Sequence, residues 1–278
     1  MTTHLPSVSI VIPAYNEARI IRRCIIADLH QTVAPHEIIV VDNLSTDDTV
    51  EVVRDLMGEF PQSGIRLVHQ SLHQGIIPTR NYGFNAATGD VIGRIDADSI
   101  VDHEWVEAVQ TVFADEEVMA ATGPVSYHDM PLRKLGLEAD NKVRRFVSSL
   151  AQDYQFLFGS NMAIRRSAWE AIATEVCYDP DNQMHEDIDM SIHLSQHDLK
   201  VVYAPTMVGG MSARRLRDSP KEYRHYVRRF ERTYANHAIM NPALRVPMVI
   251  YLAIYYPLKA LQALYDKDGE TARINSSQ

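Results

Sequence analysis

The stretch Val91-Ile-Gly-Arg-Ile-Asp-Ala-Asp-Ser99 (VIGRIDADS) places two aspartates, Asp96 and Asp98, directly after a short apolar run. In an extended chain, residues i and i+2 lie on the same side, so both carboxylates can face one point. Two like charges placed so close repel each other unless a cation lies between them. A solvated turn at the end of a strand also explains the pattern, because Asp is common in turns. Features elsewhere in the sequence are needed to choose between a cation site and a turn.

Short apolar runs recur through the first hundred residues. They occupy residues 8–12, 37–42, 65–69 and 90–95. Runs that are apolar almost throughout, rather than alternating, predict strands of a parallel sheet with helices on both faces. Right-handed crossovers then bring the carboxyl ends of the strands to one edge, where open α/β sheets bind ligands. We therefore expect the acidic residues that follow these runs to be neighbours: Glu17, Asp42, Asp96 and Asp98.

Helix-start signals complete the pattern. Ser45-Thr-Asp-Asp48 has the form of a capping box and predicts a helix over 46–57. Ser219-Pro-Lys-Glu222 is a second capping box, with proline at the first helical position, and it predicts a long helix through Tyr234. A basic helical stretch is expected over 133–152. Because no linker rich in Gly, Pro and Ser divides the chain, we predict one continuous α/β domain with a helical C-terminal tail.

Composition narrows the class of protein. The chain has 278 residues, 46% hydrophobic and 23% charged, as expected for a soluble globular protein. Its formal net charge of −9 argues against a nucleic-acid-binding protein, which needs a basic face. Cys24 and Cys177 lack metal-type spacing in the sequence and are interpreted as reduced, buried thiols of a cytoplasmic protein. The amino terminus has neither the basic region nor the long apolar region of a signal peptide.

An uncharged apolar segment, residues 246–258, lies near the carboxyl end, flanked by Arg245 and Lys259. It is shorter than the roughly 20 residues that a membrane-spanning helix needs. Pro247 and Pro257 lie near its two ends. Three interpretations remain open: a buried terminal helix, an interfacial helix at a membrane surface through about residues 246–265, and a contact between copies of the chain.

The order of several short motifs is similar to that in family 2 glycosyltransferases, over roughly the first 215 residues. The motifs are Val8-Ser-Ile-Val-Ile-Pro-Ala-Tyr-Asn-Glu17, Val40-Val-Asp42, Thr79-Arg-Asn-Tyr-Gly83, Asp96-Ala-Asp98, Gly159-Ser-Asn161 and Glu186-Asp187. Each is weak alone, but their combination is specific. The resemblance implies a GT-A fold, a nucleotide-diphosphate sugar donor, a divalent metal and inversion at the anomeric carbon. It also implies a nucleotide-sugar half over about 1–100, an acceptor half over about 101–215, and a helical extension over 216–278.

The resemblance also assigns the donor side. It implies that the Pro13 to Glu17 loop, including Tyr15, holds the nucleoside together with Asp42. Arg80 resembles the cation that meets the base or the diphosphate. Asp96 and Asp98 resemble the Asp-x-Asp element, with one carboxylate near the ribose or sugar and the other on the metal. Oxygen ligands of this kind suit Mn²⁺ or Mg²⁺.

On the acceptor side, the resemblance makes Asp187 the general base, with Glu186 orienting the base or the acceptor. An acidic helix amino terminus also accounts for these two residues, because the helix dipole favours carboxylates there. Gly159, Ser160 and Asn161 correspond to a loop near the donor sugar and acceptor, although a tight turn is nearly as good an interpretation. The positive charge of Arg214 and Arg215 fits either a lid over the diphosphate or a solvated basic turn.

His185 and Asp189 have the i, i+4 spacing of helical metal ligands, which we interpret as coincidence because the sequence offers no further ligand.

Departures from the family pattern narrow the prediction. The chain has no Gln-x-x-Arg-Trp motif, and so transfer of a single sugar is favoured over polymer extrusion. UDP is favoured as the donor nucleotide only because it is common. The expected acceptor is a glycan or a lipid-linked sugar of the cell envelope, at the inner face of the membrane, and a homo-oligomer remains open. The rival classes are a nucleotidyltransferase and a non-catalytic nucleotide-sugar-binding or membrane-associated partner protein on the same fold.

Overall fold

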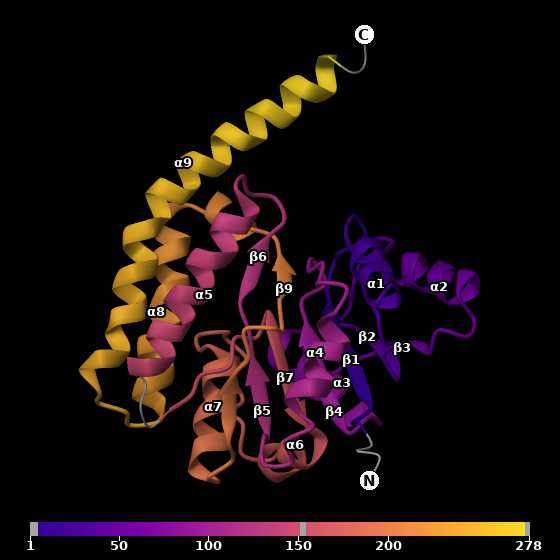
Figure 1. Ribbon diagram of the computed structural model, residues 1–278, viewed down its shortest axis with the longest axis horizontal. Coiled ribbons are helices and arrows are strands. Elements are labelled where there is room, and N and C mark those ends of the chain that lie inside the picture. The colour runs from indigo at the N-terminus through magenta and orange to yellow at the C-terminus, as the bar shows by residue number, and fades with distance from the viewer. Residues whose placement is uncertain (1–4, 151–153, 276–278) are drawn as a thin grey trace.

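The computed structural model describes residues 5–150 and 154–275, and its centre is a seven-stranded sheet (Figure 1). The strand order is β3-β2-β1-β4-β7-β5-β8. The sheet is mostly parallel, but β7 runs antiparallel to both β4 and β5. A small second sheet pairs β6 with β9 in parallel. The strands are β1 (Val8–Ala14), β2 (Glu37–Asp42), β3 (Ile65–His69), β4 (Val91–Ile95), β5 (Ala120–Thr122), β6 (Val125–Tyr127), β7 (Asn161–Arg165), β8 (Val201–Tyr203) and β9 (Gly209–Met211).

Helices cover both faces of the sheet, as the continuous apolar strands predicted. They are α1 (Ile21–Leu29), α2 (Thr49–Glu59), α3 (Ile76–Ala86), α4 (Trp105–Val112), α5 (Arg133–Leu150), α6 (Arg166–Ile172), α7 (Glu186–Gln196), α8 (Pro220–Asn236) and α9 (Val246–Asn275), with short 3₁₀ helices η1 (Arg214–Arg217) and η2 (Pro242–Arg245). The expected helix over 133–152 ends at Leu150, and residues 151 and 152 lie outside the described part of the chain.

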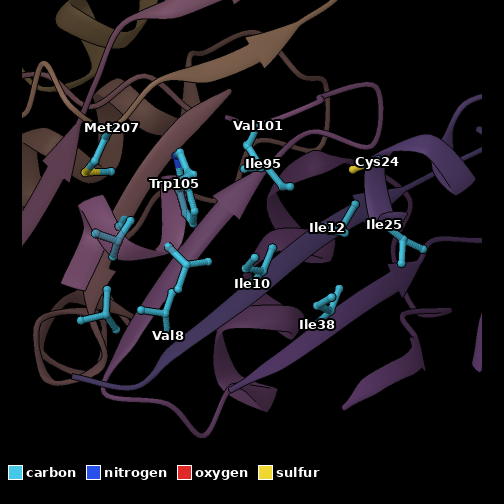
Figure 2. Close-up of a cluster of buried hydrophobic side chains, with 14 of the residues drawn as sticks. Val8, Ile10, Ile12, Cys24, Ile25, Ile38, Ile95, Val101, Trp105 and Met207 are labelled. Atoms are coloured by element: carbon cyan, nitrogen blue, oxygen red, sulfur yellow. The ribbon is translucent and has the colours of Figure 1, made fainter. Parts of the chain in front are cut away.

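Alternate residues of each strand pack into opposite cores. Ile10 and Ile12 of β1 lie in one core with residues of α1, α2 and α4, and Figure 2 shows part of that cluster. Val11 lies in the other core, with residues of α3, α6 and α7. Gly93 of β4 is needed on the first face, because a Cβ there would lie 3.0 Å from Cζ3 of the buried Trp105. Both faces of the sheet are therefore covered by apolar side chains and shielded from water. Residues that bind ligands are expected at the edges of the sheet.

The predicted helical C-terminal tail, α8 and α9, contributes to a third core. Ile188 and Ile192 of α7 pack in one cluster with Val227 of α8 and Met248 and Tyr255 of α9. The predicted capping box opens α8. The Ser219 hydroxyl accepts a bond from the Glu222 amide at 3.3 Å, and the Glu222 carboxylate accepts one from the Ser219 amide at 2.8 Å. The C-terminal extension is thus packed against the helix that carries Glu186 and Asp187.

The capping box predicted at Ser45 is wrong, because α2 begins at Thr49 and its N-cap residue Asp48 makes no side-chain cap. The Ser45 hydroxyl instead accepts a hydrogen bond from the Asn16 amide at 3.1 Å. The Thr46 amide donates to the Asn16 side-chain oxygen at 2.8 Å. The polar groups that resembled a cap therefore join the loops that follow β1 and β2.

The apolar segment near the carboxyl end is longer than predicted, because α9 continues through Pro257 instead of ending there. Within the described residues, Pro242–Tyr265 is long and apolar enough to cross a membrane, by length and composition alone. Only 22% of its apolar window is buried, although Met248 and Tyr255 pack in the third core. Val249, Leu252, Tyr256 and Leu264 are exposed on it. A proline is tolerated in such a helix where the freed carbonyl can be solvated.

Candidate active site

The carboxyl ends of three neighbouring strands form the rim of the candidate site. Pro13 and Ala14 of β1 pair with Val41 and Asp42 of β2, and β4 lies on the other side of β1. Asp42 is 6% exposed, and its carboxylate lies 3.2 Å from Nδ1 of His69 and accepts the Ser45 amide. The side chain of Tyr15, which follows β1, is half exposed. These residues line the side of the rim assigned to the nucleoside.

Glu17 and Asp98, which are 81 positions apart, meet at one arginine. Nη1 of Arg214 lies 2.9 Å from Oε1 of Glu17, and its Nε lies 3.0 Å from Oδ2 of Asp98. Arg214 is half exposed on η1, whereas Asp98 is 5% exposed. The predicted basic lid residue thus lies on the acidic rim in this structure.

A second arginine, Arg94, connects the Asp-x-Asp element to α7. Its Nη2 lies 2.8 Å from Oδ1 of Asp96, and its Nη1 lies 2.6 Å from Oε1 of Glu186. Arg94 is 4% exposed, so both ion pairs are largely shielded from water. This bridge brings the end of β4 and the start of α7 into one site, although they are about 90 residues apart.

Asp187 is held by two backbone amides. Its Oδ2 accepts the Gly159 amide at 2.7 Å, and its Oδ1 accepts the Ile188 amide at 2.9 Å. Gly159 is buried against Arg94, and a Cβ there would lie 3.0 Å from the guanidinium Cζ and 3.2 Å from Oε1 of Glu186. The glycine of the Gly159-Ser-Asn161 stretch is therefore required by the close approach of Arg94, and its amide orients the Asp187 carboxylate.

Glu186 and Asp187 are adjacent carboxylates with opposite pKa shifts. Burial tends to raise the pKa of Glu186, but Arg94 and Arg80 outweigh it and hold that pKa at about 2. Burial and the neighbouring charge of Glu186 raise the pKa of Asp187 to about 6, against the Gly159 amide and Arg94. A carboxylate with its pKa near the working pH is suited to act as a general base. Of the two, Asp187 is the one placed to exchange protons.

Asp98 has a raised pKa, about 6, for related reasons. Burial is the largest cause, and the charges of Asp96 and Glu17 add to it, while Arg214 opposes it. Crowded carboxylates of this kind are relieved by a cation, and carboxylate oxygens are the ligands that Mn²⁺ and Mg²⁺ prefer. The residues present therefore fit a divalent ion, provided that Arg214 moves away from Asp98.

Two other predicted residues, Arg80 and Asn161, make contacts inside the protein framework. Arg80 is fully buried and donates to the Glu186 carbonyl at 3.0 Å, so it fixes the start of α7. Asn161 is also fully buried; its side chain donates to the Pro124 and Met207 carbonyls and accepts from the Trp105 indole. Their predicted contacts with a donor or acceptor stay predictions. Ser160, which precedes Asn161, is partly buried.

Arg215 points to a different place from Arg214. Its guanidinium lies 4.5 Å from the ring centroid of Tyr226, and it lies 3.2 Å from the Asp218 carboxylate. Arg215 and Asp218 line a hollow of about 260 Å³. Its other lining residues are Glu222, His225, Tyr226 and Arg229. His185, which precedes Glu186, stacks edge-on against Tyr226 with ring centroids 4.8 Å apart. The hollow therefore lies beside the start of α7, on its α8 side.

Arg94 is the residue that reasoning from the sequence missed. It lies two positions before Asp96, and so on the same side of an extended chain as Asp96 and Asp98. The period-2 argument applied to the two aspartates would have included it. Its second partner, Glu186, could not have been found in this way, because that pairing depends on how α7 packs against the sheet.

Comparisons with known proteins identify the family of the chain. The model of the family described as Glycosyl transferase family 2 matches residues 9–172, and that of Glycosyl transferase family group 2 matches residues 91–263. A chondroitin synthase of Pasteurella multocida is 35% identical over 116 residues, which is 42% of this chain and 12% of that protein. Glycosyltransferase AglE of Haloferax volcanii is 31% identical over 129 residues, 46% of this chain and 42% of that protein. The chain thus matches less than half the length of these relatives.

Solved structures show the same fold. A mannosyltransferase of Pyrobaculum calidifontis, solved with GDP-Man and Mn²⁺, has a TM-score of 0.65 at 20% identity, covering 98% of this chain and 76% of that one. TarS of S. aureus has a TM-score of 0.55 at 14% identity, covering 90% of this chain and 43% of that one. The fold is therefore GT-A. More particularly, the chain belongs to glycosyl transferase family 2, whose model matches more than half of it.

Proposed function

We propose that this enzyme moves one sugar from a nucleoside-diphosphate sugar to an acceptor hydroxyl with inversion, and that Asp187 is the base. The observation that carries the proposal is the chain of contacts around the rim. Arg214 joins Glu17 to Asp98, and Arg94 joins Asp96 to Glu186, the neighbour of Asp187. These contacts support a single site that combines an acidic cluster with a carboxylate whose pKa is raised.

The acceptor oxygen attacks the anomeric carbon on the face opposite the diphosphate, and its proton passes to Asp187. The new glycosidic C–O bond forms as the bond from the anomeric carbon to the phosphate oxygen breaks, and the nucleoside diphosphate leaves with the electron pair. The Gly159 and Ile188 amides keep the Asp187 carboxylate in place. A base within hydrogen-bond reach contributes roughly 10²–10⁴-fold to the rate.

The donor occupies the carboxyl edge of β1, β2 and β4, with the loop Pro13 to Glu17 and Asp42 around the nucleoside. Asp98 and Asp96 would hold Mn²⁺ or Mg²⁺, which supplies positive charge to the departing diphosphate. Arg214 would turn from Glu17 and Asp98 toward the phosphates as the donor enters. This movement leaves the carboxylates free and closes η1 over the donor.

We favour UDP as the donor nucleotide. One similar structure, GalNAc-T7, was solved with UDP, GalNAc and Mn²⁺, which supports this choice. The mannosyltransferase was solved with GDP-Man, so GDP is the second candidate. The acceptor, a glycan or lipid-linked sugar, is proposed to approach from the hollow beside Tyr226 and Arg229. We assign the donor and acceptor halves to residues 1–100 and 101–215, and the extension to 216 onward.

We further propose that the enzyme works in the cytoplasm at the inner face of a membrane. The face of α9 that carries Val249, Leu252 and Tyr256 is apolar and exposed, and α8, which packs along α9, exposes Lys221 and Arg224. Apolar and basic helices side by side suit an anionic lipid surface. Sedimentation with anionic vesicles should capture the wild type and lose the Val249→Glu/Tyr256→Glu variant. Equal capture of both would contradict the proposal, and a dimer through α9 would show instead as a concentration-dependent mass.

Release of nucleoside diphosphate from a panel of UDP- and GDP-sugars, with Mn²⁺ and an acceptor extract, tests the reaction itself. We expect release with one donor, loss of release with chelator, and a loss of at least 10²-fold in Asp187→Asn. Asp115→Asn, at an exposed ion pair with Lys200, is the matched control and should retain full activity. Donor binding without turnover in the wild type would instead favour a non-catalytic sugar-nucleotide binder.

A further inference from the structure

Four side chains that can bind a metal come from three segments of the chain and meet at α7. They are Cys177, Asp189, His193 and His237, and one ligand atom of each lies within 4.8 Å of all the others. Asp189 and His193 are one turn apart on α7, Cys177 follows α6, and His237 ends α8. None of the four belongs to the rim of the candidate active site.

We propose that these four side chains form a structural Zn²⁺ site, which we name the α7 zinc site. Two imidazoles, a thiolate and a carboxylate make a ligand set that zinc binds in tetrahedral geometry. Zinc bonds of about 2.0–2.3 Å place tetrahedral ligand atoms roughly 3.3–3.8 Å apart. The distance from Cys177 Sγ to His237 Nε2 is 3.8 Å, and that from His193 Nε2 to Asp189 Oδ1 is 3.7 Å.

His193 is the observation that points to a ligand. It is 8% exposed, and both of its ring nitrogens are buried with no hydrogen-bond partner in the structure. Its two nearest carboxylates, those of Glu175 and Asp189, are each 3.7 Å away, too far for a hydrogen bond. Buried polar atoms are nearly always satisfied, and a metal at this point would satisfy Nε2.

Neighbouring groups form hydrogen bonds to the proposed ligands, as groups around a metal site commonly do. The Asn236 amide nitrogen lies 3.2 Å from Cys177 Sγ and can donate to a thiolate. The Cys177 amide donates to Oδ2 of Asp189 at 2.9 Å, which leaves Oδ1 for the metal. Oδ1 now lies 2.7 Å from His237 Nε2, a hydrogen bond whose proton zinc would displace. Outer hydrogen bonds of this kind orient ligands and tune the metal.

Zinc here would fasten α7 to the end of α8 and to the chain after α6. Asp187 lies two residues before Asp189 on α7, so the metal would hold the proposed base in position without touching the substrate. The sequence shows only part of this set, because His185 and Asp189 share the i, i+4 spacing but His185 faces Tyr226 and Phe230. The true helical partner of Asp189 is His193.

Zinc content decides the proposal. The full chain, expressed with zinc and dialysed against metal-free buffer, should retain about one zinc per chain by mass spectrometry of the metal. Cys177→Ser and His193→Gln should lose it, while His197→Gln, on an exposed histidine one turn further along, should keep it. Asp98→Asn should also keep it, which separates this metal from one at the active-site rim.

A second measurement remains valid if His193→Gln fails to fold. Wild-type chain freed of metal and given Co²⁺ should develop the absorption of a tetrahedral cobalt–thiolate centre, and Cys177→Ser should lack the thiolate band. Chelator should lower the melting temperature of the wild type but not of Cys177→Ser. Wild-type zinc content no higher than that of Cys177→Ser, or Co²⁺ without a thiolate band, would show a hydrogen-bonded cluster only and overturn the α7 zinc site.

Discussion

Gly159→Ala should lower both the free energy of unfolding and the turnover rate of this enzyme. The new Cβ would overlap Nη1 of Arg94 and lie 3.0 Å from its Cζ and 3.2 Å from Oε1 of Glu186. The guanidinium cannot swing away freely, because Asp96 holds its other side at 2.8 Å. To restore ordinary contact it must move on the order of 1 Å, which separates it from Glu186.

The loss of stability comes from breaking the ion pair between Arg94 and Glu186. Losing one partner of a buried ion pair costs about 3–5 kcal/mol, and Glu186 retains some contact with water, so we expect the lower end of that range. The Gly159 amide, which orients Asp187, shifts at the same time. A misplacement of about 1 Å near a reacting group costs roughly 10²-fold in rate.

Urea unfolding and steady-state kinetics would measure the two effects. Gly136→Ala is the matched control, because a Cβ there meets no atom within 4 Å and Gly136 lies inside α5. That control should be neutral or about 0.5–1 kcal/mol more stable, with unchanged kcat/KM. If Gly159→Ala unfolds within about 1 kcal/mol of the control and turns over normally, the Arg94 bridge does not organise the site.

Three further predictions concern charge at the rim. Because the pKa of Asp187 is raised to about 6, kcat at saturating donor and Mn²⁺ should rise as pH increases through 6 and level off above it; a rate that is constant down to pH 5 would argue against this base. Asp98→Asn should weaken Mn²⁺-dependent donor binding at least about 10-fold by calorimetry, with metal-free binding little changed. Arg214→Gln should tighten Mn²⁺ binding and lower turnover, because Glu17 and Asp98 lose their present counterion. Weaker Mn²⁺ binding would show that Arg214 and the metal do not compete for these carboxylates.

Much of the fold was predictable because it depends on local patterns. The continuous apolar runs at 8–12, 37–42, 65–69 and 90–95 predicted strands of a mostly parallel sheet, and the structure has β1 to β4 there, with two dry faces. The capping box at Ser219 was also correct, since Pro220 and Glu222 act within a few residues of it. The one at Ser45 was wrong because Asn16, far away in the chain, takes the same polar groups.

The sequence proposed individual residues for the candidate site, but not the contacts between them. Spacing pointed to Asp96 and Asp98, and the family resemblance pointed to Asp187. Neither pointed to Arg94, which pairs with Glu186 of α7. Nor did spacing show that Asn161 is used inside the framework.

The sequence by itself determined the strands, the dry sheet and the acidic residues at its edge, because hydrophobic periodicity and residue type are local properties. Tertiary packing decided which charges meet. It alone sets the distance from Arg94 to Glu186, the burial that raises the pKa of Asp187, and the meeting of Cys177, Asp189, His193 and His237. Electrostatic energies depend on distance and on exclusion of water, and both quantities exist only once segments remote in the chain have packed together.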